Sequence, residues 1–128
     1  MYAGFGAVLG HNYPFYLKFK GGKGIACMSG FILACFLPIA PLCLILFVGA
    51  VAITRYVSLG SILVAISFFA QLVIFGETGI IPMAEQYRME IYGVGAVFSL
   101  LALWKHRANI KRLLTGTENK FGSKKKEP

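Results

Sequence analysis

Hydrophobic residues fill long stretches of this chain, and short polar segments separate them. The longest apolar stretches are 25–53, 57–75 and 89–104, and a shorter one covers residues 1–9. In a bilayer core only helices and closed barrels satisfy their own backbone groups. Because a helix needs roughly 20 apolar residues to cross, the pattern predicts an all-α polytopic membrane helix bundle with about four spans, plus the end of a fifth at residues 1–9.

Residues 25–53 are too long for one comfortable span, and Pro38 and Pro41 interrupt them. Proline lacks an N–H donor and clashes with the preceding helical turn. Two interpretations are open: one kinked helix, or two short helices over about 24–37 and 42–54 that turn around the prolines at the far membrane surface. Each short helix would be only roughly 20 Å long at about 1.5 Å per residue, so we expect local thinning of the bilayer or tilted neighbours.

Charged residues favour the two-helix interpretation, because Lys and Arg mark the cytoplasmic side of a membrane protein. Two helices place the lysines of 18–23, Arg55 and the basic segment 105–112 on one side, and the acidic loop 76–87 on the other. A single helix would put the two basic segments on opposite sides. The pattern therefore predicts that three polar clusters meet at one membrane face: 10–24, 55–58 and 106–120.

Composition supports a membrane location and limits the kinds of partner and ligand that we expect. Hydrophobic residues make up 57% of the chain, the formal net charge is +8, Asp is absent, and the mean hydropathy is +0.70. The basic residues lie at the ends of apolar stretches, so we expect anionic lipid head groups as partners and no nucleic acid. The three cysteines lie in apolar sequence without metal-ligand spacing. We expect buried thiols, and neither a metal nor a cofactor.

Residues 10–24 combine a histidine, three lysines and four glycines just before the apolar stretch that begins at Ile25. The glycines therefore lie where a helix begins, and a helix N-terminus presents free N–H groups and a partial positive charge that suit phosphate. We expect an anion site, with phosphate favoured, and His11 as a supporting residue. The alternative is a cytoplasmic charge flank that only orients a membrane helix. The phosphate-binding candidates are Lys20, Gly21, Gly22, Lys23 and Gly24.

Familiar catalytic and nucleotide-binding motifs can be excluded. A P-loop needs Ser or Thr directly after its Gly-Lys, but Gly24 follows Lys23. The early glycines at 4, 6 and 10 have the wrong spacing for a dinucleotide fingerprint. A Ser-His-Asp triad cannot form because the chain has no Asp.

His106 and Asn109 are three residues apart, so a helix would place them on one face. We predict that they form a catalytic pair that binds a substrate hydroxyl. The alternative is an interfacial basic helix with a solvated tail. Gly116 is a natural helix stop, and residues 123–128 are predicted to be a disordered basic tail.

Arg55 and Ser58 lie between two predicted spans, and both are expected to support the site. For Ser58 and the neighbouring Ser61 an alternative is open. Serine at the start of a helix more commonly caps it than binds a ligand.

Four blocks of the sequence together resemble one protein family. They are Gly-His-Asn-Tyr-Pro (10–14), Lys-Phe-Lys-Gly-Gly-Lys-Gly (18–24), Thr-Arg-Tyr-Val-Ser-Leu-Gly-Ser (54–61) and the segment from His106 to Lys120. In this order they resemble the bacterial membrane glycerol-3-phosphate acyltransferases that use acyl phosphate as donor. The resemblance covers nearly the whole chain.

The resemblance implies a seven-span enzyme of the bacterial inner membrane, with its active site and C-terminus in the cytoplasm. Such enzymes move a fatty acyl group from acyl phosphate to the 1-hydroxyl of glycerol 3-phosphate. The products are lysophosphatidate and phosphate, in phospholipid biosynthesis. The expected partners are glycerol 3-phosphate, fatty acyl phosphate and a bilayer with anionic head groups. The resemblance also implies glycerol phosphate binding by residues 20–24, polar contacts from His106, Asn109 and Glu118, and the donor's own phosphate as the base.

The family also carries an earlier block, Gly-Ser-Gly-Asn-x-Gly-Ala-Thr-Asn, with a catalytic serine and arginine in that region. Neither this block nor the family's preceding spans are present here. We therefore expect residues 1–122 to be the C-terminal portion of the transmembrane acyltransferase domain, truncated at its N-terminus.

A different class of function is the alternative: a non-catalytic membrane module, such as a scaffold or small transporter subunit, or an inactive fragment. Transporters usually carry ionisable residues near the middle of the bilayer. Here the ionisable side chains lie near the ends of the predicted spans, which disfavours transport.

Overall fold

The computed structural model describes residues 1–18 and 21–122. Within these ranges the regular elements are all helical, which confirms the all-α prediction. Two predictions lie outside the described residues: the phosphate contact of Lys20 and the disordered basic tail 123–128. The elements are α1 (Tyr2–Asn12), η1 (Phe15–Leu17), α2 (Ile25–Cys35), η2 (Leu37–Ile39), α3 (Ala40–Thr54), α4 (Val57–Glu77), α5 (Glu85–Lys105) and α6 (Arg107–Leu114).

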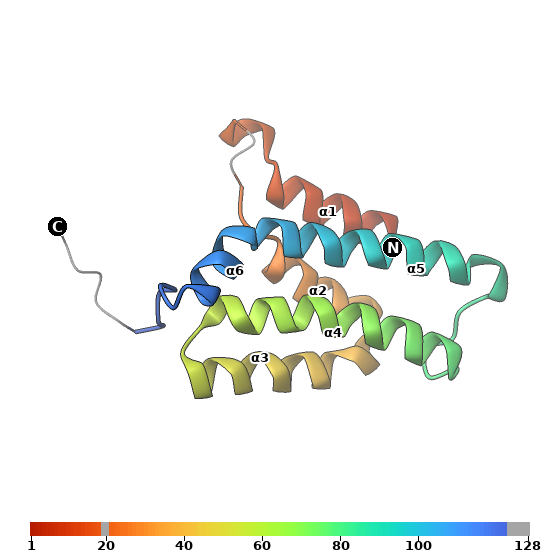
Figure 1. The fold of residues 1–128 in the computed structure, drawn as a ribbon. Coiled ribbons are helices and arrows are strands. Elements are labelled where there is room, and N and C mark those ends of the chain that lie inside the picture. The colour runs from red at the N-terminus through yellow and green to blue at the C-terminus, as the bar shows by residue number, and fades with distance from the viewer. Residues whose placement is uncertain (19–20, 123–128) are drawn as a thin grey trace.

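The stretch 25–53 forms two helices, as the charge pattern indicates. Helix α2 ends at Cys35, and the prolines lie in the first turns of the short helix η2 and of α3. A proline is tolerated there because the N–H it lacks would have no partner in the helix. Pro38 and Pro41 therefore start new helices instead of kinking one, and Figure 1 shows α2 and α3 running in opposite directions.

Helices α2 and α3 are shorter than the pair that follows them. They have 11 and 15 residues, against 21 each for α4 and α5. In Figure 1, α4 and α5 continue past the turn between α2 and α3. The turn therefore lies partway along α4, whereas the sequence led us to expect it level with the far ends of the spans.

Aromatic side chains form the centre of the bundle. Phe68 of α4 and Phe98 of α5 are 0% and 1% exposed, and their ring centroids lie 6.0 Å apart. Phe31 of α2 stacks on Phe98 at 5.3 Å, and Phe36 approaches Phe68 edge-on. Ring quadrupoles favour such offset and edge-on contacts. These contacts join α2, α4 and α5 in the interior of the bundle.

Close contacts also join α4 to its two sequence neighbours. A Cβ placed on Gly60 would lie 2.9 Å from the Phe47 ring of α3, so the missing side chain lets these helices approach. The Ser99 hydroxyl of α5 donates to the Ala65 carbonyl of α4 at 2.8 Å. Small residues and interhelical hydrogen bonds of this kind hold helices together in membranes.

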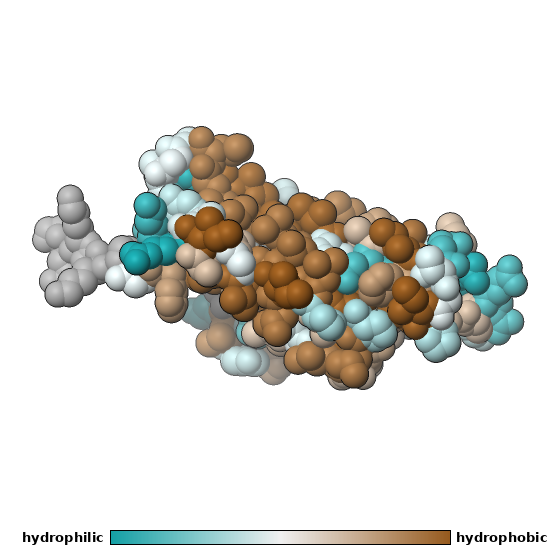
Figure 2. Space-filling view, turned by 90° about the horizontal axis from the view of Figure 1, so that it is seen from below, coloured by the Kyte–Doolittle hydropathy of each residue, from teal (hydrophilic) through white to brown (hydrophobic). Residues whose placement is uncertain are grey.

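The surface has the distribution expected of a membrane protein. Figure 2 shows apolar side chains across the middle of one face, with hydrophilic residues gathered at the two ends. Within residues 1–18 and 21–122, two helical segments are long and apolar enough to cross a membrane, Leu37–Thr54 and Val57–Glu77. Further spans at α2 and α5 stay predictions from the sequence.

Candidate functional site

A pocket of about 540 Å³ lies at the end of the bundle where three polar segments meet. Figure 1 places the connection between α1 and α2, the turn between α3 and α4, and α6 at this same end. The predicted meeting of three polar clusters is therefore confirmed. The residues that line the pocket are His11, Lys23, Gly24, Ile25, Ala26, Val57, Ser58, Ser61, His106, Asn109, Arg112, Glu118 and Asn119.

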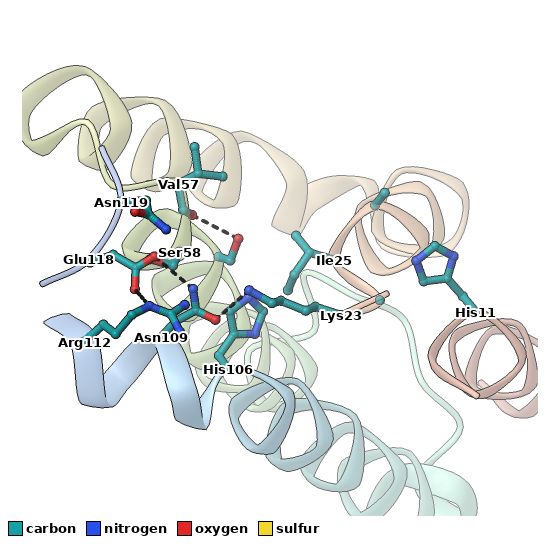
Figure 3. Close-up of a pocket in the computed structure, with 13 residues that line it drawn as sticks. His11, Lys23, Ile25, Val57, Ser58, His106, Asn109, Arg112, Glu118 and Asn119 are labelled. Atoms are coloured by element: carbon teal, nitrogen blue, oxygen red, sulfur yellow. Dashed lines mark hydrogen bonds and ion pairs between the residues drawn. The ribbon is translucent and has the colours of Figure 1, made fainter. Parts of the chain in front are cut away.

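The start of α2 forms one wall of this pocket. Gly24 precedes the helix with φ = 78°, a left-handed conformation that suits glycine. No side chain caps α2, so its first N–H groups, including those of Ile25 and Ala26, have no partner within the helix. Lys23 extends from the same turn toward Asn109 (Figure 3).

The end of α6 forms the opposite wall. Gly116 follows the helix with φ = 69°, and its N–H donates to the Leu113 carbonyl at 3.2 Å. The next N–H, of Thr117, donates to the Arg112 carbonyl at 2.8 Å. This is the Schellman pattern, which confirms Gly116 as the helix stop and turns the chain back, so that Glu118 lies against α6.

A chain of hydrogen bonds crosses the pocket from one wall to the other (Figure 3). Lys23 Nζ donates to Asn109 Oδ1 at 2.5 Å, and Asn109 Nδ2 donates to Glu118 Oε1 at 3.0 Å. Arg112 Nε then donates to Glu118 Oε2 at 2.9 Å. These bonds fix which way the Asn109 amide points, and they hold the two cations at defined places.

Two cations, Lys23 and Arg112, and one anion, Glu118, give the pocket a net positive charge. Burial lowers the pKa of Lys23, and the nearby Glu118 carboxylate partly offsets this. Burial raises the pKa of Glu118, but hydrogen bonds from Arg112 and Asn109 outweigh burial and leave that pKa lowered. The lowered pKa of Glu118 favours its carboxylate form beside the two cations.

His106 lies at the junction of α5 and α6 and is 2% exposed. Its Nδ1 is 2.8 Å from the Ala102 carbonyl oxygen. Burial lowers the pKa of His106, and the Lys23 ammonium lowers it further, against smaller opposing effects of the Ala102 carbonyl and Glu118. The ring is thus neutral at pH 7. With the proton on Nδ1, where it bonds the carbonyl, Nε2 is an acceptor.

The two serines at the start of α4 are not helix caps. Tyr56 is the N-cap residue, and no side chain caps this helix. The Ser61 hydroxyl donates to the Val57 carbonyl at 3.1 Å. The Ser58 hydroxyl is buried in the pocket wall; it lies close enough to Glu118 to favour the carboxylate, yet it makes no hydrogen bond of standard geometry.

The structure brings together most of the residues predicted for the site, but not all of them. His11, Lys23, Gly24, Ser58, His106, Asn109 and Glu118 line the pocket, whereas Gly21, Gly22 and Arg55 do not. The Arg55 side chain is exposed. Its backbone carbonyl accepts the Phe121 N–H at 2.7 Å, which fastens the segment that carries Glu118.

Sequence reasoning missed the specific role of Arg112 and gave no role to Asn12. Arg112 lies three residues after Asn109, so the helical spacing that pairs His106 with Asn109 also places Arg112 on the pocket side. Asn12 is fully buried, and both polar atoms of its side chain lack a hydrogen-bond partner. A polar residue directly after His11 in an otherwise apolar helix was the available signal.

An apolar groove of about 730 Å³ continues from the pocket between α2, α3 and α4. Ile25, Ala26, Val57 and Ser61 line both cavities. The groove walls include Leu33, Leu44 and Phe47 among other apolar side chains. Among the described residues, no group of three or more His, Cys, Asp or Glu side chains could hold a metal ion.

These features define a class: an all-helical, largely apolar bundle with a positively charged pocket at its polar end and an apolar groove leading away from it. The family model of glycerol-3-phosphate acyltransferases matches residues 1–116. This chain belongs to that family.

Individual relatives agree with the family assignment. The glycerol-3-phosphate acyltransferases of Halalkalibacterium halodurans and Geobacter sulfurreducens are 40% and 43% identical to this chain over 124 and 122 residues. These regions cover 96% and 92% of the chain, and 57% and 56% of the relatives. The chain therefore spans little more than half the length of the relatives it matches.

Solved structures of one relative share the fold. Crystal structures of PlsY (YgiH), described as an integral membrane glycerol 3-phosphate acyltransferase, match with a TM-score of 0.77 and 38% identity, over 91% of this chain. The matched region is 53% of that protein in its glycerol 3-phosphate form and 54% in its lysophosphatidic acid form. The match to an integral membrane protein supports the fold class predicted from the apolar stretches.

Proposed function

We propose that this chain carries the glycerol 3-phosphate site of an acyl-phosphate-dependent acyltransferase. In this reaction a fatty acyl group passes from acyl phosphate to the 1-hydroxyl of glycerol 3-phosphate, which gives lysophosphatidate and phosphate. The observation that carries the proposal is the pocket itself, where two cations, the start of α2 and neutral His106 surround one polar space. The glycerol 3-phosphate and lysophosphatidic acid forms of the related structure support it.

The phosphate of glycerol 3-phosphate fits the side of the pocket formed by Lys23 and Gly24. A phosphate monoester needs fixed cations and N–H donors, and a helix start supplies the donors together with a favourable dipole. Lys23 adds a charge-assisted hydrogen bond. The unpartnered Ser58 hydroxyl provides one further donor within the same pocket.

The hydroxyl that attacks the acyl group fits beside His106. Nε2 of the neutral ring accepts a hydrogen bond, so the substrate hydroxyl donates its hydrogen bond to the ring. This contact orients the hydroxyl and leaves the lone pairs of its oxygen free to attack the acyl carbon. Asn109 contributes to the same site by fixing a cation. Its amide oxygen accepts a hydrogen bond from the Lys23 ammonium and so holds that group in place. Glu118 in turn fixes the amide.

The acyl chain of the donor fits the apolar groove. The groove meets the pocket at Ile25, Ala26, Val57 and Ser61, so a molecule with a phosphate at one end and a hydrocarbon at the other can occupy both. Its acyl carbonyl would then lie at the junction of the two cavities. A soluble phosphate ester and a lipid would meet at that point.

The chemistry needs no nucleophile from the protein. The hydroxyl oxygen forms a bond to the acyl carbonyl carbon, and the carbon–oxygen bond to the donor phosphate breaks. The hydroxyl proton, held in the hydrogen bond to His106 Nε2 before the attack, passes to the departing phosphate, which leaves as hydrogen phosphate. Lys23 and Arg112 stabilise the negative charge that develops on the oxygens.

We further propose that the pocket faces the cytoplasm of a bacterial inner membrane. Lys23 and Arg112 line the pocket, and Lys105 and Lys111 belong to the end of α5 and to α6, next to the pocket-lining His106 and Asn109. Basic residues mark the cytoplasmic side. The same residues attract anionic head groups, which would hold the surrounding lipid at the pocket mouth.

The test is acyl transfer by the purified chain in liposomes, with radiolabelled glycerol 3-phosphate and palmitoyl phosphate. We expect labelled lysophosphatidate and an equal amount of phosphate. His106→Ala should lower kcat by about 100-fold, because the attacking hydroxyl would lose the acceptor that orients it. Arg107→Ala is the matched control, because Arg107 is exposed and lies outside the pocket lining.

Two results would contradict the proposal. The absence of both labelled product and glycerol 3-phosphate binding is one, and an equal effect of His106→Ala and Arg107→Ala is the other. Equilibrium dialysis with the same labelled substrate measures binding separately, so a chain that binds glycerol 3-phosphate without turnover would retain the site and lose the activity.

A further inference from the structure

The glycines after the lysine cluster lie against the end of α1. A Cβ placed on Gly21 would be 2.1 Å from the His11 carbonyl oxygen, and one on Gly22 would be 2.3 Å from His11 Nε2. A Cβ on Gly24 would be 2.8 Å from Asn12 Oδ1. Three glycines therefore meet two consecutive residues. At Gly21 the nearest atom is a backbone oxygen, which leaves no room for a side chain, whereas at Gly22 the exposed His11 ring would have to turn aside.

The backbone of this turn is also bonded to α1. The Gly22 N–H donates to the His11 carbonyl at 3.2 Å, so this donor is already used within the protein. Gly21 and Gly22 do not line the pocket. An explanation in which these glycines expose bare N–H groups to a ligand does not match this arrangement.

The end of α1 is in turn fixed to the end of α5. Lys105 Nζ donates to the Asn12 carbonyl at 3.0 Å and lies 3.7 Å from the centroid of the Tyr13 ring. Lys105 directly precedes His106 in the sequence. A continuous series of contacts therefore links His106, through Lys105 and the end of α1, to the turn that carries Lys23.

We propose that His11 and Asn12 are positioning residues, and that the glycines at 21, 22 and 24 serve to pack this turn onto them. The packing sets where Lys23 and the first N–H groups of α2 point, and the contacts through Lys105 set their distance from His106. The inference rests on the proposed function for its ligand, glycerol 3-phosphate. It differs in assigning the glycines to contacts within the protein.

A double-mutant cycle between Gly22 and His11 separates the two explanations. Gly22→Ala should raise the KM for glycerol 3-phosphate by about fivefold, with a smaller change in kcat, because the added methyl group displaces the His11 ring; that ring is exposed, so the lower end of the cost of overpacking applies. His11→Ala removes that ring. Since His11 is exposed, the substitution leaves no buried cavity. In the double variant, Ala at position 22 should change KM by less than about twofold relative to His11→Ala alone.

Thermal unfolding in detergent gives a second readout that does not depend on activity. Gly22→Ala should lower the midpoint, and the same substitution in the His11→Ala background should not. Gly30→Ala is the control, because Gly30 lies in α2 with no atom within 4 Å of an added Cβ and lines neither cavity. It should leave both the midpoint and the KM close to those of the unmodified chain.

The proposal is overturned if Gly22→Ala raises KM equally with and without the His11 ring, because the glycine would then serve the ligand. It is also overturned if Gly22→Ala behaves like Gly30→Ala. Should the unmodified chain bind no glycerol 3-phosphate in dialysis, the proposed function fails, while the unfolding cycle still decides whether His11 holds the turn.

Discussion

Replacement of Lys23 by methionine tests the phosphate site most directly. Methionine keeps much of the length of the side chain and removes the ammonium group. The variant loses the hydrogen bond from Lys23 Nζ to Asn109 Oδ1, which is 2.5 Å long. It also loses one of the two cations in the pocket, so the net charge there falls to zero.

The size of the effect follows from the contact. A hydrogen bond to a charged group contributes about 1.5–3 kcal/mol, and about 1.4 kcal/mol corresponds to a factor of ten in affinity at 25 °C. Lys23 is only partly buried, and solvent screening weakens its interactions, so the lower end of the range applies. We expect the KM for glycerol 3-phosphate to rise by about tenfold, with kcat reduced much less.

Initial rates at a saturating concentration of palmitoyl phosphate measure this effect. Lys18→Met is the matched control: Lys18 belongs to the same lysine cluster, is exposed and lies outside the pocket lining. It should change KM by less than about twofold. Equal effects of the two substitutions would refute the reasoning, because the lysines would then act through a general surface potential and not through a defined contact.

The lowered pKa of Lys23 predicts a loss of affinity for glycerol 3-phosphate at alkaline pH. Its pKa is lowered by burial, so its positive charge, and with it the attraction for phosphate, is present below that pKa and is lost as the pH rises through it. The KM should therefore begin to rise at a lower pH than the ordinary lysine pKa near 10.5 would give. Lys23→Met should show no such rise. A rise of the same size in the variant would assign the titration to another group.

Three further predictions follow from the pocket and the helix contacts. Because burial lowers the pKa of His106, kcat should be constant near neutral pH and fall only below about 6.5, as protonation removes the Nε2 acceptor; a pH profile with its midpoint above that value would contradict this. Ala26→Trp should fill the junction of pocket and groove and raise the KM for palmitoyl phosphate more than that for glycerol 3-phosphate in steady-state assays. Gly60→Leu should lower the thermal midpoint by forcing the Phe47 ring away from α4, whereas Gly49→Leu, with open space around it, should not.

The fold was predictable from the sequence because its main signals are local. Apolar length predicts where the long helices lie, and the distribution of Lys and Arg correctly favours two helices over one in residues 25–53. The depth of the turn between them was not predictable. It depends on how α2 and α3 pack against α4, through contacts such as Phe36 with Phe68, and those contacts join residues far apart in the sequence.

The candidate site was likewise predictable only where its signals are local in the sequence. Helical spacing predicts the shared face of His106 and Asn109, and Gly116 predicts the stop that returns Glu118 to α6. The role of the glycines was not decidable from the sequence, because a glycine that leaves room for a ligand and one that leaves room for a neighbouring helix look identical there. The proximity of His11 to Gly22 is the observation that favours packing within the protein in our proposal.

The short α2 and α3 pair explains how one site could serve two unlike substrates. If both helices were as long as α4, their walls would reach the far end of the bundle, and the groove between them would extend as far. Instead α2 has 11 residues, and its first turn forms the side of the pocket proposed for phosphate, while its length lines the groove. One helix thus presents N–H donors to water at its start and apolar side chains to lipid along its side. The boundary between the two falls at Ile25 and Ala26, which is where an acyl carbonyl must lie if its phosphate and its hydrocarbon chain are to bind at once.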